Sequence, residues 1–494
     1  MTRAMTGLRV PRAPDQGFLV LTQSEVESIH SNALDLLFRT GVVVHSDPAL
    51  ALLGRAGALV SPEDQRVRIP VQMVQEALDL APSTVTLYSR LGEPAMLLGA
   101  GGFHARTSSG ATRVLDLQTR RLRTATSQDA ADAARVADAL PRVHGVSSMA
   151  VQPGDVPAEL VDVYAVRTAL AHTTKPLGYV CLNESLIESV ITMAKAVAGG
   201  PEALRTRPIL TALAESTSPL SLVSSQMAVL QAFALQGLPL TLHAHPIAGF
   251  SAPVTLAGTL VVMHAEILAM VTITQLIRPR TPVIYGMSSS VADMRGARNL
   301  SGAAEIGLLG SAVAHLARRC GLPALMSSGT DAHAPGAQSV MERLMTLLPP
   351  ALAGIDLVNL TTLGTKMSFS LEQLVIDDVA LCLVGRLLRG IQVDEERLAM
   401  DLIHQVGPAG SYIEAAHTRR YHREELLTPS LLVRDTVESW EASGAPTLGS
   451  RARREAERIL AEHRPVPLTA EVEAQLDQVV QAAGREGRKR VGLR

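Results

Sequence analysis

Short apolar runs alternate with longer amphipathic segments along the middle of the chain, from about residue 142 to residue 400. Short apolar runs bounded by Gly or Pro predict buried strands, and apolar positions that recur every three to four residues predict helices. Seven strand–helix units follow one another in this way, one fewer than the eight of a closed barrel. The predicted helices span 158–172, 185–198, 220–236, 253–277, 301–319, 337–349 and 371–389.

This alternation predicts an α/β fold, a (β/α)8 TIM barrel over residues 142–400 with one strand not recognised. A doubly wound open sheet is the alternative, but no GxGxxG motif follows a first strand, so dinucleotide binding has no support. We expect an N-terminal α+β extension over residues 21–141 and a C-terminal helical region over residues 401–494. The N-terminus, residues 1–20, is expected to be disordered. Three short strands are expected to form a small β layer in the extension: "STVTLYSR", "GGFHARTSS" and "TRVLDLQT".

Two helices of the extension carry recognisable start signals. In "TQSEVESIHSNALDLLFRTG" the first helix begins at Thr22 or Ser24, each followed by a glutamate at capping-box spacing or close to it. In "TSQDAADAARVADAL" either Thr126 or Ser127 is the N-cap. Both segments are therefore predicted to be helical.

Composition narrows the class of protein. A formal net charge of -2 over 494 residues argues against nucleic acid as a partner, because phosphate binding needs a concentrated positive field. Three scattered cysteines exclude a disulfide framework and indicate a reducing compartment. The opening residues lack the apolar core of a signal peptide, and the apolar stretch 252–277 contains His264 and Glu266, so it is interpreted as a buried helix and no membrane partner is expected. A cytoplasmic location follows.

Polar side chains gather where the predicted strands end, which is where a barrel places its chemistry. His243 and His245 alternate on one strand and so share a face; they line a pocket if that face is the barrel interior and are core histidines if it is not. Asp331 and His333 follow the strand "LPALMSS", and Asp331 is either a site residue or the N-cap of the next helix. The remaining strand-end candidates are Glu215 as a counter-charge and Tyr285 and Phe250 as aromatic faces for a cation.

Several segments resemble the trimethylamine methyltransferase family, in its branch that lacks pyrrolysine. The likeness runs from about residue 20 to residue 450, and its specificity comes from the order and spacing of many segments. The matching stretches are "LTQSEVESIHSNALDLLFRTGVVV", "TSQDAADAARVADALP", "PIAGFSAPVTLAGTLVVMHAEILA", "GLPALMSSGTDAHAPGAQSVME", "SLEQLVIDDVALCLVGRLLRGIQVDEERLAMDLIHQVGPAGSYIEAAHTRR" and "YHREELLTPSLLVRDTVESWEASG".

The resemblance implies a (β/α)8 barrel that moves a methyl group from a quaternary or tertiary amine, such as a betaine, to the Co(I) of a separate corrinoid protein. No cofactor would be bound tightly by this chain, and the corrinoid would stay on the partner. His333 stands at or next to the place of pyrrolysine in the founding members, and with Asp331 it is the implied catalytic pair. Gln338 ends the same segment and is taken as substrate-binding, as is the family-matched His417.

Two features depart from the family pattern. "LHAHPIAG" places two histidines where less polar residues are expected, and only 3% of residues are aromatic, so Glu215 or Asp331 is expected to balance the ammonium charge in place of an aromatic cage. Two other functions stay open. One is a metal-dependent hydrolase or lyase using His243, His245, His333 and a carboxylate, and the other is a non-catalytic betaine-binding protein. The polar helical tail packs against the barrel or a second subunit, so a homo-oligomer is one of the two expectations.

Overall fold

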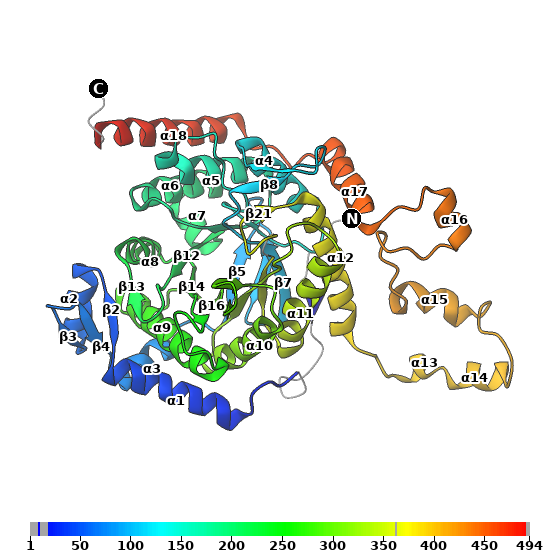
Figure 1. Ribbon diagram of the computed structural model, residues 1–494, viewed down its shortest axis with the longest axis horizontal. Coiled ribbons are helices and arrows are strands. Elements are labelled where there is room, and N and C mark those ends of the chain that lie inside the picture. Colours follow the sequence, from blue (N-terminus) through cyan, green and yellow to red (C-terminus); the bar gives the residue numbers. More distant parts are fainter. Residues whose placement is uncertain (1–7, 10–17, 361–362, 491–494) are drawn as a thin grey trace.

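A ring of eight parallel strands lies at the centre of the molecule, with helices around it (Figure 1). The computed structural model describes residues 8–9, 18–360 and 363–490. The strand order is β7-β20-β19-β16-β14-β12-β11-β10, and a parallel bridge between Arg106 and Gly145 brings the two ends of the ring together. The barrel strands are β7 (Gly102–Thr107), β10 (Val146–Ser147), β11 (Leu177–Tyr179), β12 (Leu210–Glu215), β14 (Leu240–Ala244), β16 (Val283–Met287), β19 (Ala324–Ser328) and β20 (Leu357–Leu360).

One helix follows each strand and covers the outside of the ring, which confirms the predicted (β/α)8 barrel. All seven predicted strand–helix units are present, and helix bounds differ from the predictions by a few residues. The outer helices are α4 (Ser127–Ala139), α5 (Val161–His172), α6 (Ile187–Ala198), α8 (Ser224–Gln236), α9 (Leu256–Ile277), α10 (Ala304–Arg319), α11 (Ala337–Ala353) and α12 (Leu371–Arg389), with the short α7 (Pro201–Thr206) after α6.

The eighth strand is β7, in the stretch "GGFHARTSS". Its assignment to a separate small β layer was wrong, because β7 pairs in parallel with β20 over four residues and so belongs to the ring. The neighbouring stretches do form small separate sheets, β5 (Val85–Tyr88) with β6 (Pro94–Leu98), and β8 (Arg113–Leu115) with β9 (Leu122–Thr124) and β21 (Ser368–Phe369). The division of the chain at residues 141 and 400 stays a prediction, and the disorder expected for residues 1–20 concerns mostly residues outside those described.

The N-terminal extension packs beside and beneath the barrel. Thr22 and Thr126 are the observed N-caps of their helices, each within a capping box. The β5–β6 hairpin inserts Val85, Leu87 and Met96 against apolar side chains of three barrel strands, so the lower end of the barrel is filled by apolar packing. The other elements are β1 (Leu8–Arg9), α1 (Gln23–Arg39), β2 (Val42–Val44), α2 (Asp47–Ala56), β3 (Leu59–Ser61), β4 (Arg66–Arg68) and α3 (Val71–Leu80), with β13 (Ser221–Leu222) joining β2.

The apolar segment that has the length of a membrane span is α9, a helix of the outer layer. It packs against α1, α2 and α3 on one side and against β14 on the other, and 72% of its most apolar window is buried. Its hydrophobicity therefore comes from burial on several faces, as predicted.

The C-terminal region divides into packed helices and a projecting segment. α17 (Leu448–Glu462) packs on α12 and α4, and α18 (Ala470–Arg490) packs on α5 and α6. Between α12 and α17 the chain leaves the barrel as a C-terminal arm (residues 390–446) that extends to one side (Figure 1). The arm contains α13 (Glu395–Leu398), α14 (Met400–Val406), α15 (Ala416–Glu425) and α16 (Val437–Ala442).

Candidate active site

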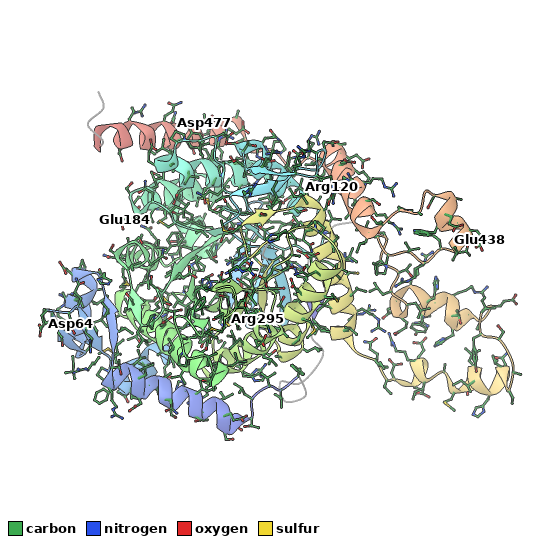
Figure 2. The ribbon with its side chains drawn as sticks, in the orientation of Figure 1. Asp64, Arg120, Glu184, Arg295, Glu438 and Asp477 are labelled. Atoms are coloured by element: carbon green, nitrogen blue, oxygen red, sulfur yellow. The ribbon has the colours of Figure 1, made fainter. Side chains whose placement is uncertain are left out.

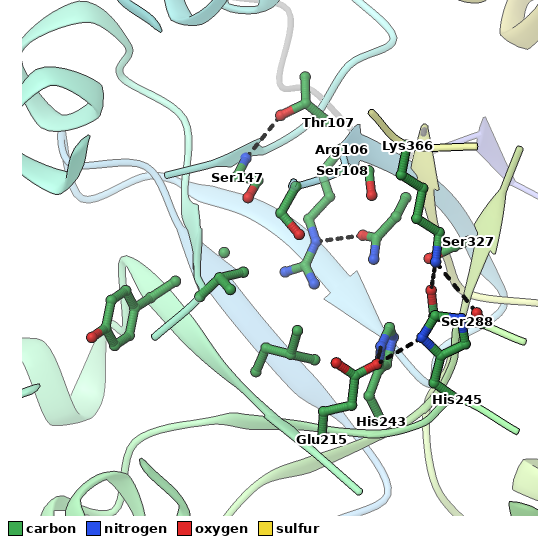
Figure 3. Close-up of a pocket in the computed structure, with 16 residues that line it drawn as sticks. Arg106, Thr107, Ser108, Ser147, Glu215, His243, His245, Ser288, Ser327 and Lys366 are labelled. Carbon is green, nitrogen blue, oxygen red and sulfur yellow. Dashed lines mark hydrogen bonds and ion pairs between the residues drawn. The ribbon is translucent and has the colours of Figure 1, made fainter. Parts of the chain in front are cut away.

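A cavity of about 180 Å³ opens inside the barrel at the carboxyl ends of its strands. This is the end of a parallel barrel at which loops and strand ends carry polar groups. The volume equals roughly six water molecules at ~30 Å³ each, so the cavity suits a small polar molecule. Its lining, drawn in Figure 3, comprises Arg106, Thr107, Ser108, Ser109, Ser147, Gly178, Tyr179, Val180, Leu213, Glu215, His243, His245, Ser288, Ser327, Asn359 and Lys366.

Three of the predicted site residues meet in this cavity. His243 and His245 both point inward from the end of β14, and Glu215 lies opposite His243 on the neighbouring β12. The Oε1 atom of Glu215 is 3.4 Å from Nδ1 of His245 and 3.9 Å from Nδ1 of His243 (Figure 3). The alternation on the strand therefore brings both imidazoles to one carboxylate.

The protonation states of this trio follow from burial and contact. Burial lowers the pKa of His243 and of His245, so both imidazoles favour the neutral form. Burial alone would raise the pKa of Glu215, but its contacts with the two histidines hold that pKa below the usual range. The cavity thus contains one carboxylate beside two neutral rings.

Arg106 brings a fixed positive charge into the same cavity from β7. Its Nε donates to Oδ1 of Asn359 at 2.7 Å and its Nη1 donates to Oγ1 of Thr211 at 3.1 Å. Burial lowers the pKa of Arg106 to about 10, which still leaves the guanidinium protonated at neutral pH. Arg106 was not among the predicted site residues, because β7 was not recognised as a barrel strand.

Lys366 is the second cationic residue of the cavity and also was not predicted. It belongs to a loop in which Gly364, Thr365 and Lys366 all have positive φ, and this turn directs the Lys366 side chain inward. Its Nζ contacts Oγ of Ser288 and lies 3.3 Å from the carbonyl oxygen of that residue. Burial lowers the pKa of Lys366, and the nearby Glu215 opposes that shift.

Two glycines on barrel strands make room for these charged and polar side chains. A Cβ at Gly286 would lie 2.2 Å from Cδ2 of His243, and a Cβ at Gly178 would lie 2.8 Å from Nη1 of Arg106. Any larger residue at either position would displace the side chain that faces it. The sequence pattern contained these glycines, but only the known register of the strands gives them this meaning.

Asp331 is placed beside the cavity and does not line it. Its carboxylate accepts hydrogen bonds from the backbone N–H groups of Ser301 and Gly302, from the Ser301 hydroxyl, and from Oγ1 of Thr365 at 2.9 Å. Because Thr365 precedes Lys366, Asp331 ties the loop that presents the lysine to the loop before α10. The predicted catalytic role of Asp331 stays a prediction.

The other candidates of the same segment lie on the outer lip. His333 is exposed, and its neighbour Ala332 accepts a hydrogen bond from the backbone of Gly364. Gln338 is exposed on α11 and donates to Glu342 at 2.8 Å. Neither His333 nor Gln338 lines the cavity, and their predicted roles stay predictions.

Three predicted residues lie away from the cavity. Tyr285 faces the outer helices, where its hydroxyl is 2.8 Å from Nδ1 of His264. The other ring nitrogen of His264, Nε2, is 2.8 Å from Nδ1 of His30. Phe250 is exposed on the loop after β14, and His417 packs against Tyr421 in the C-terminal arm, with ring centroids 4.7 Å apart. The two rings proposed as faces for a cation therefore do not line this cavity.

The geometry does not assemble the predicted metal alternative. His333 lies outside the cavity that holds His243 and His245. Among the described residues, the one group with metal-ligand spacing is His30, His264 and Cys320, which is buried between α1, α9 and the end of α10. The two histidines of that group are within hydrogen-bond distance of each other, so their burial is explained by packing and hydrogen bonding.

A closed barrel with a charged cavity at the carboxyl ends of its strands is the architecture of an enzyme active site. The family model for trimethylamine methyltransferase (MTTB) matches residues 2–487, so the chain belongs to the trimethylamine methyltransferase family, as its sequence segments predicted.

Curated relatives show the same likeness over most of the chain. A glycine betaine methyltransferase of Desulfitobacterium hafniense is 31% identical over 471 residues, covering 94% of this chain and 97% of that protein. The trimethylamine methyltransferase MttB of Methanosarcina barkeri is 32% identical over 473 residues, with 94% and 95% covered. The monomethylamine methyltransferase structure of Methanosarcina barkeri has a TM-score of 0.48 at 10% identity, covering 90% of this chain and 89% of the other.

Proposed function

We propose that this protein transfers a methyl group from a betaine, a quaternary ammonium that also carries a carboxylate, to a reduced corrinoid protein. One observation carries the choice of substrate. The cavity holds Arg106 and Lys366 as cationic groups together with the single carboxylate of Glu215. A zwitterion matches this arrangement at both of its ends.

Each charged group of the cavity is complementary to one end of a betaine. Neither Arg106 nor Lys366 forms an ion pair within the described part of the chain, so a substrate carboxylate would find two unpaired cations. Glu215 would face the ammonium. Trimethylamine has no carboxylate, and its cation would enter a cavity in which positive groups outnumber negative ones.

The two imidazoles leave further polar atoms for a ligand. Both ring nitrogens of His243 and Nε2 of His245 are buried without a hydrogen-bond partner among the described residues. Buried polar atoms are normally satisfied, so atoms of this kind beside a cavity favour a bound polar molecule. We assign His243 and His245 the task of orienting the carboxylate or the ammonium head group.

The reaction requires no proton transfer from these residues to the leaving amine. A quaternary ammonium leaves as a neutral amine once a methyl group is removed, so no proton donor is needed at the nitrogen. The residues bind the substrate, exclude water and hold one methyl group toward the mouth of the barrel. Reduced cobalt of a corrinoid supplies the nucleophile that accepts the methyl group.

The dimensions of the cavity support a separate corrinoid protein. About 180 Å³ is below the ~300 Å³ of a pocket for a drug-sized ligand, and a corrin ring is larger still. The corrinoid therefore has to approach from outside while the amine sits within. Relatives named for glycine betaine and for trimethylamine are about equally similar to this chain, so the charges of the cavity carry the choice between them.

A spectroscopic assay tests the proposal. The protein is mixed with a reduced corrinoid protein and one amine at a time, and conversion of the Co(I) spectrum to that of methyl-Co(III) is followed. We expect transfer from one or more betaines and none from trimethylamine. Transfer from trimethylamine alone would overturn the substrate assignment, and tight betaine binding without transfer, with a corrinoid protein known to accept methyl groups from another enzyme, would indicate a binding protein.

A further inference from the structure

Glu266 is a fully buried carboxylate in the middle of the apolar helix α9. It does not line the cavity of the barrel. Burying such a group is costly unless hydrogen bonds compensate, and an apolar side chain would serve the packing of a hydrophobic helix equally well. The carboxylate of Glu266 therefore has a role that the packing of α9 does not explain.

The Glu266 carboxylate binds the loop that follows β12. Its Oε2 accepts hydrogen bonds from the hydroxyl groups of Ser216 at 2.6 Å and Ser218 at 2.8 Å. Its Oε1 accepts from the backbone N–H of Leu220 at 2.8 Å. The φ of Leu220 is 54°, a left-handed conformation that is unfavourable for leucine, so the backbone needs support at this point. Glu266 thus holds the loop 216–220 at both of its ends.

This loop begins at the residue after Glu215, the carboxylate of the cavity. The backbone N–H of Ser216 also donates to the carbonyl oxygen of His243 at 2.9 Å. Ser216 thereby joins the end of β12 to the end of β14, next to the two residues whose side chains meet in the cavity. A displacement of Ser216 would therefore move the side chains of Glu215 and His243 relative to each other.

The chain beyond the loop is held by a different part of the molecule. Residues 221–222 form β13, which pairs with β2 of the N-terminal sheet. That sheet lies at the edge of the molecule, where Asp64 marks it in Figure 2. The end of the loop that adjoins the cavity is held by α9, because the Glu266 carboxylate accepts from both Ser216 and Ser218.

We propose that Glu266 is a positioning residue for the methyl transfer and keeps Glu215 directed at the ammonium of the substrate. The assignment rests on the proposed function, because that function gives Glu215 its task. Burial raises the pKa of Glu266 and the nearby Glu215 raises it further, so the two carboxylates lie within electrostatic reach of each other. Glu266 acts through the loop, since it does not reach the cavity itself.

Two substitutions of Glu266 distinguish a held loop from a released one. Glu266→Gln keeps the size of the side chain, and its oxygen can accept from Leu220 while its amide donates to the serine hydroxyls, which are able to accept. Glu266→Ala removes these partners. His264→Ala is the matched control, because His264 is equally buried on α9 but contacts Tyr285 and His30, away from this loop.

Isothermal titration calorimetry compares glycine betaine with 3,3-dimethylbutyrate, which has carbon in place of the charged nitrogen. A carboxylate that moves a few Å from an ammonium loses attraction equivalent to about 10-fold in affinity at an effective dielectric constant of ~20. Glu266→Ala should lower the preference for the betaine by that factor, whereas Glu266→Gln and His264→Ala should keep the wild-type preference. A Glu266→Ala variant that has a lower Tm and an unchanged preference would overturn the proposal.

A second measurement does not depend on the proposed substrate. In protein labelled with 13C at Cε1 of histidine, the signals of His243 and His245 are identified because each is lost in the corresponding glutamine variant. Burial lowers the pKa of both rings and the contact with Glu215 opposes that shift, so both signals should move when Glu266→Ala displaces Glu215.

The histidine signals separate failure of the positioning role from failure of the proposed function. A wild type that does not prefer glycine betaine over 3,3-dimethylbutyrate would contradict the proposed function, and the signals of His243 and His245 would then decide alone. Movement of both signals in Glu266→Ala, with none in His264→Ala, supports Glu266 as the group that positions Glu215. Unchanged signals in Glu266→Ala would overturn that role.

Discussion

Replacing Glu215 by glutamine removes the negative charge of the cavity while keeping its size. Glu215 is the one carboxylate among the lining residues, and its side chain is about one-third exposed toward the cavity. Two opposite unit charges 5 Å apart at an effective dielectric constant of 20 attract by about 3 kcal/mol. Desolvation of the substrate offsets roughly half of that, so Glu215→Gln should weaken the binding of a betaine by about 10-fold to 100-fold.

The effect can be separated from a change of shape with a neutral analogue. 3,3-Dimethylbutyrate has the form of glycine betaine with carbon in place of the charged nitrogen, so it reports everything except the ammonium charge. Isothermal titration calorimetry should show that the wild type prefers the betaine and that Glu215→Gln binds both molecules about equally. The pKa of Glu215 lies below the usual range, so the preference should persist down to about pH 5.

Two results would refute the assignment of Glu215 to the ammonium. If the variant keeps the wild-type preference for the charged ligand, Glu215 does not face the ammonium. If both ligands lose affinity equally, Glu215 acts only by holding His243 and His245 in place. Thermal unfolding of the variant, compared with that of the wild type, checks that the barrel is intact.

Three further outcomes are expected. Gly286→Ala should move the imidazole of His243 and lower transfer at least 10-fold with a loss of a few degrees in Tm, whereas wild-type transfer would show that the ring is not needed. The amide of Asp331→Asn can accept hydrogen bonds on one oxygen only, so the loop of Lys366 should loosen and Tm should fall. The KM for a betaine should rise more than kcat falls. A fall in kcat alone would instead make Asp331 catalytic. Burial lowers the pKa of His104 in the folded protein from 6.5 to about 4, so folding favours the neutral ring. The unfolded chain binds a proton at this histidine first, so the stability present above pH 6.5 should be lost as the pH falls from 6.5 toward 4. Denaturant unfolding at pH 7.5 and 5.5 should therefore show a smaller acid loss in His104→Gln than in the wild type, by about 1.4 kcal/mol, and equal losses would contradict the assignment.

The fold could be predicted because the barrel repeats one signal many times. Apolar strands followed by amphipathic helices recur with a constant rhythm, and the register of any one unit is not needed to recognise it. β7 was not recognised as a barrel strand because its interior positions are His104 and Arg106. Apolar and polar residues therefore alternate along it, as in an antiparallel strand with one face exposed to solvent. A barrel strand with polar interior residues lacks the continuous apolar run by which buried strands are recognised in a sequence.

The site could be predicted only in part, and each difference has a physical reason. Glu215, His243 and His245 lie at strand ends, where architecture alone brings them together. Tyr285 was chosen for its place near a strand end, but Gly286 faces the interior beside His243, so strict alternation along β16 sends Tyr285 outward. Lys366 lies in a loop whose left-handed turn has no periodic sequence signal, so the direction of its side chain could not be predicted from the pattern.

The apolar floor formed by the β5–β6 hairpin has a kinetic consequence for the proposed reaction. Leu87 and Leu98 pack with Ile284, Leu325 and Leu357, so apolar side chains fill the lower end of the barrel between these strands. Substrate and product would then use the same opening, at the carboxyl ends of the strands, at which the corrinoid protein docks. Turnover would have to follow a fixed order in which the amine enters first, the methyl acceptor closes over it, and the demethylated amine departs only after the acceptor has gone.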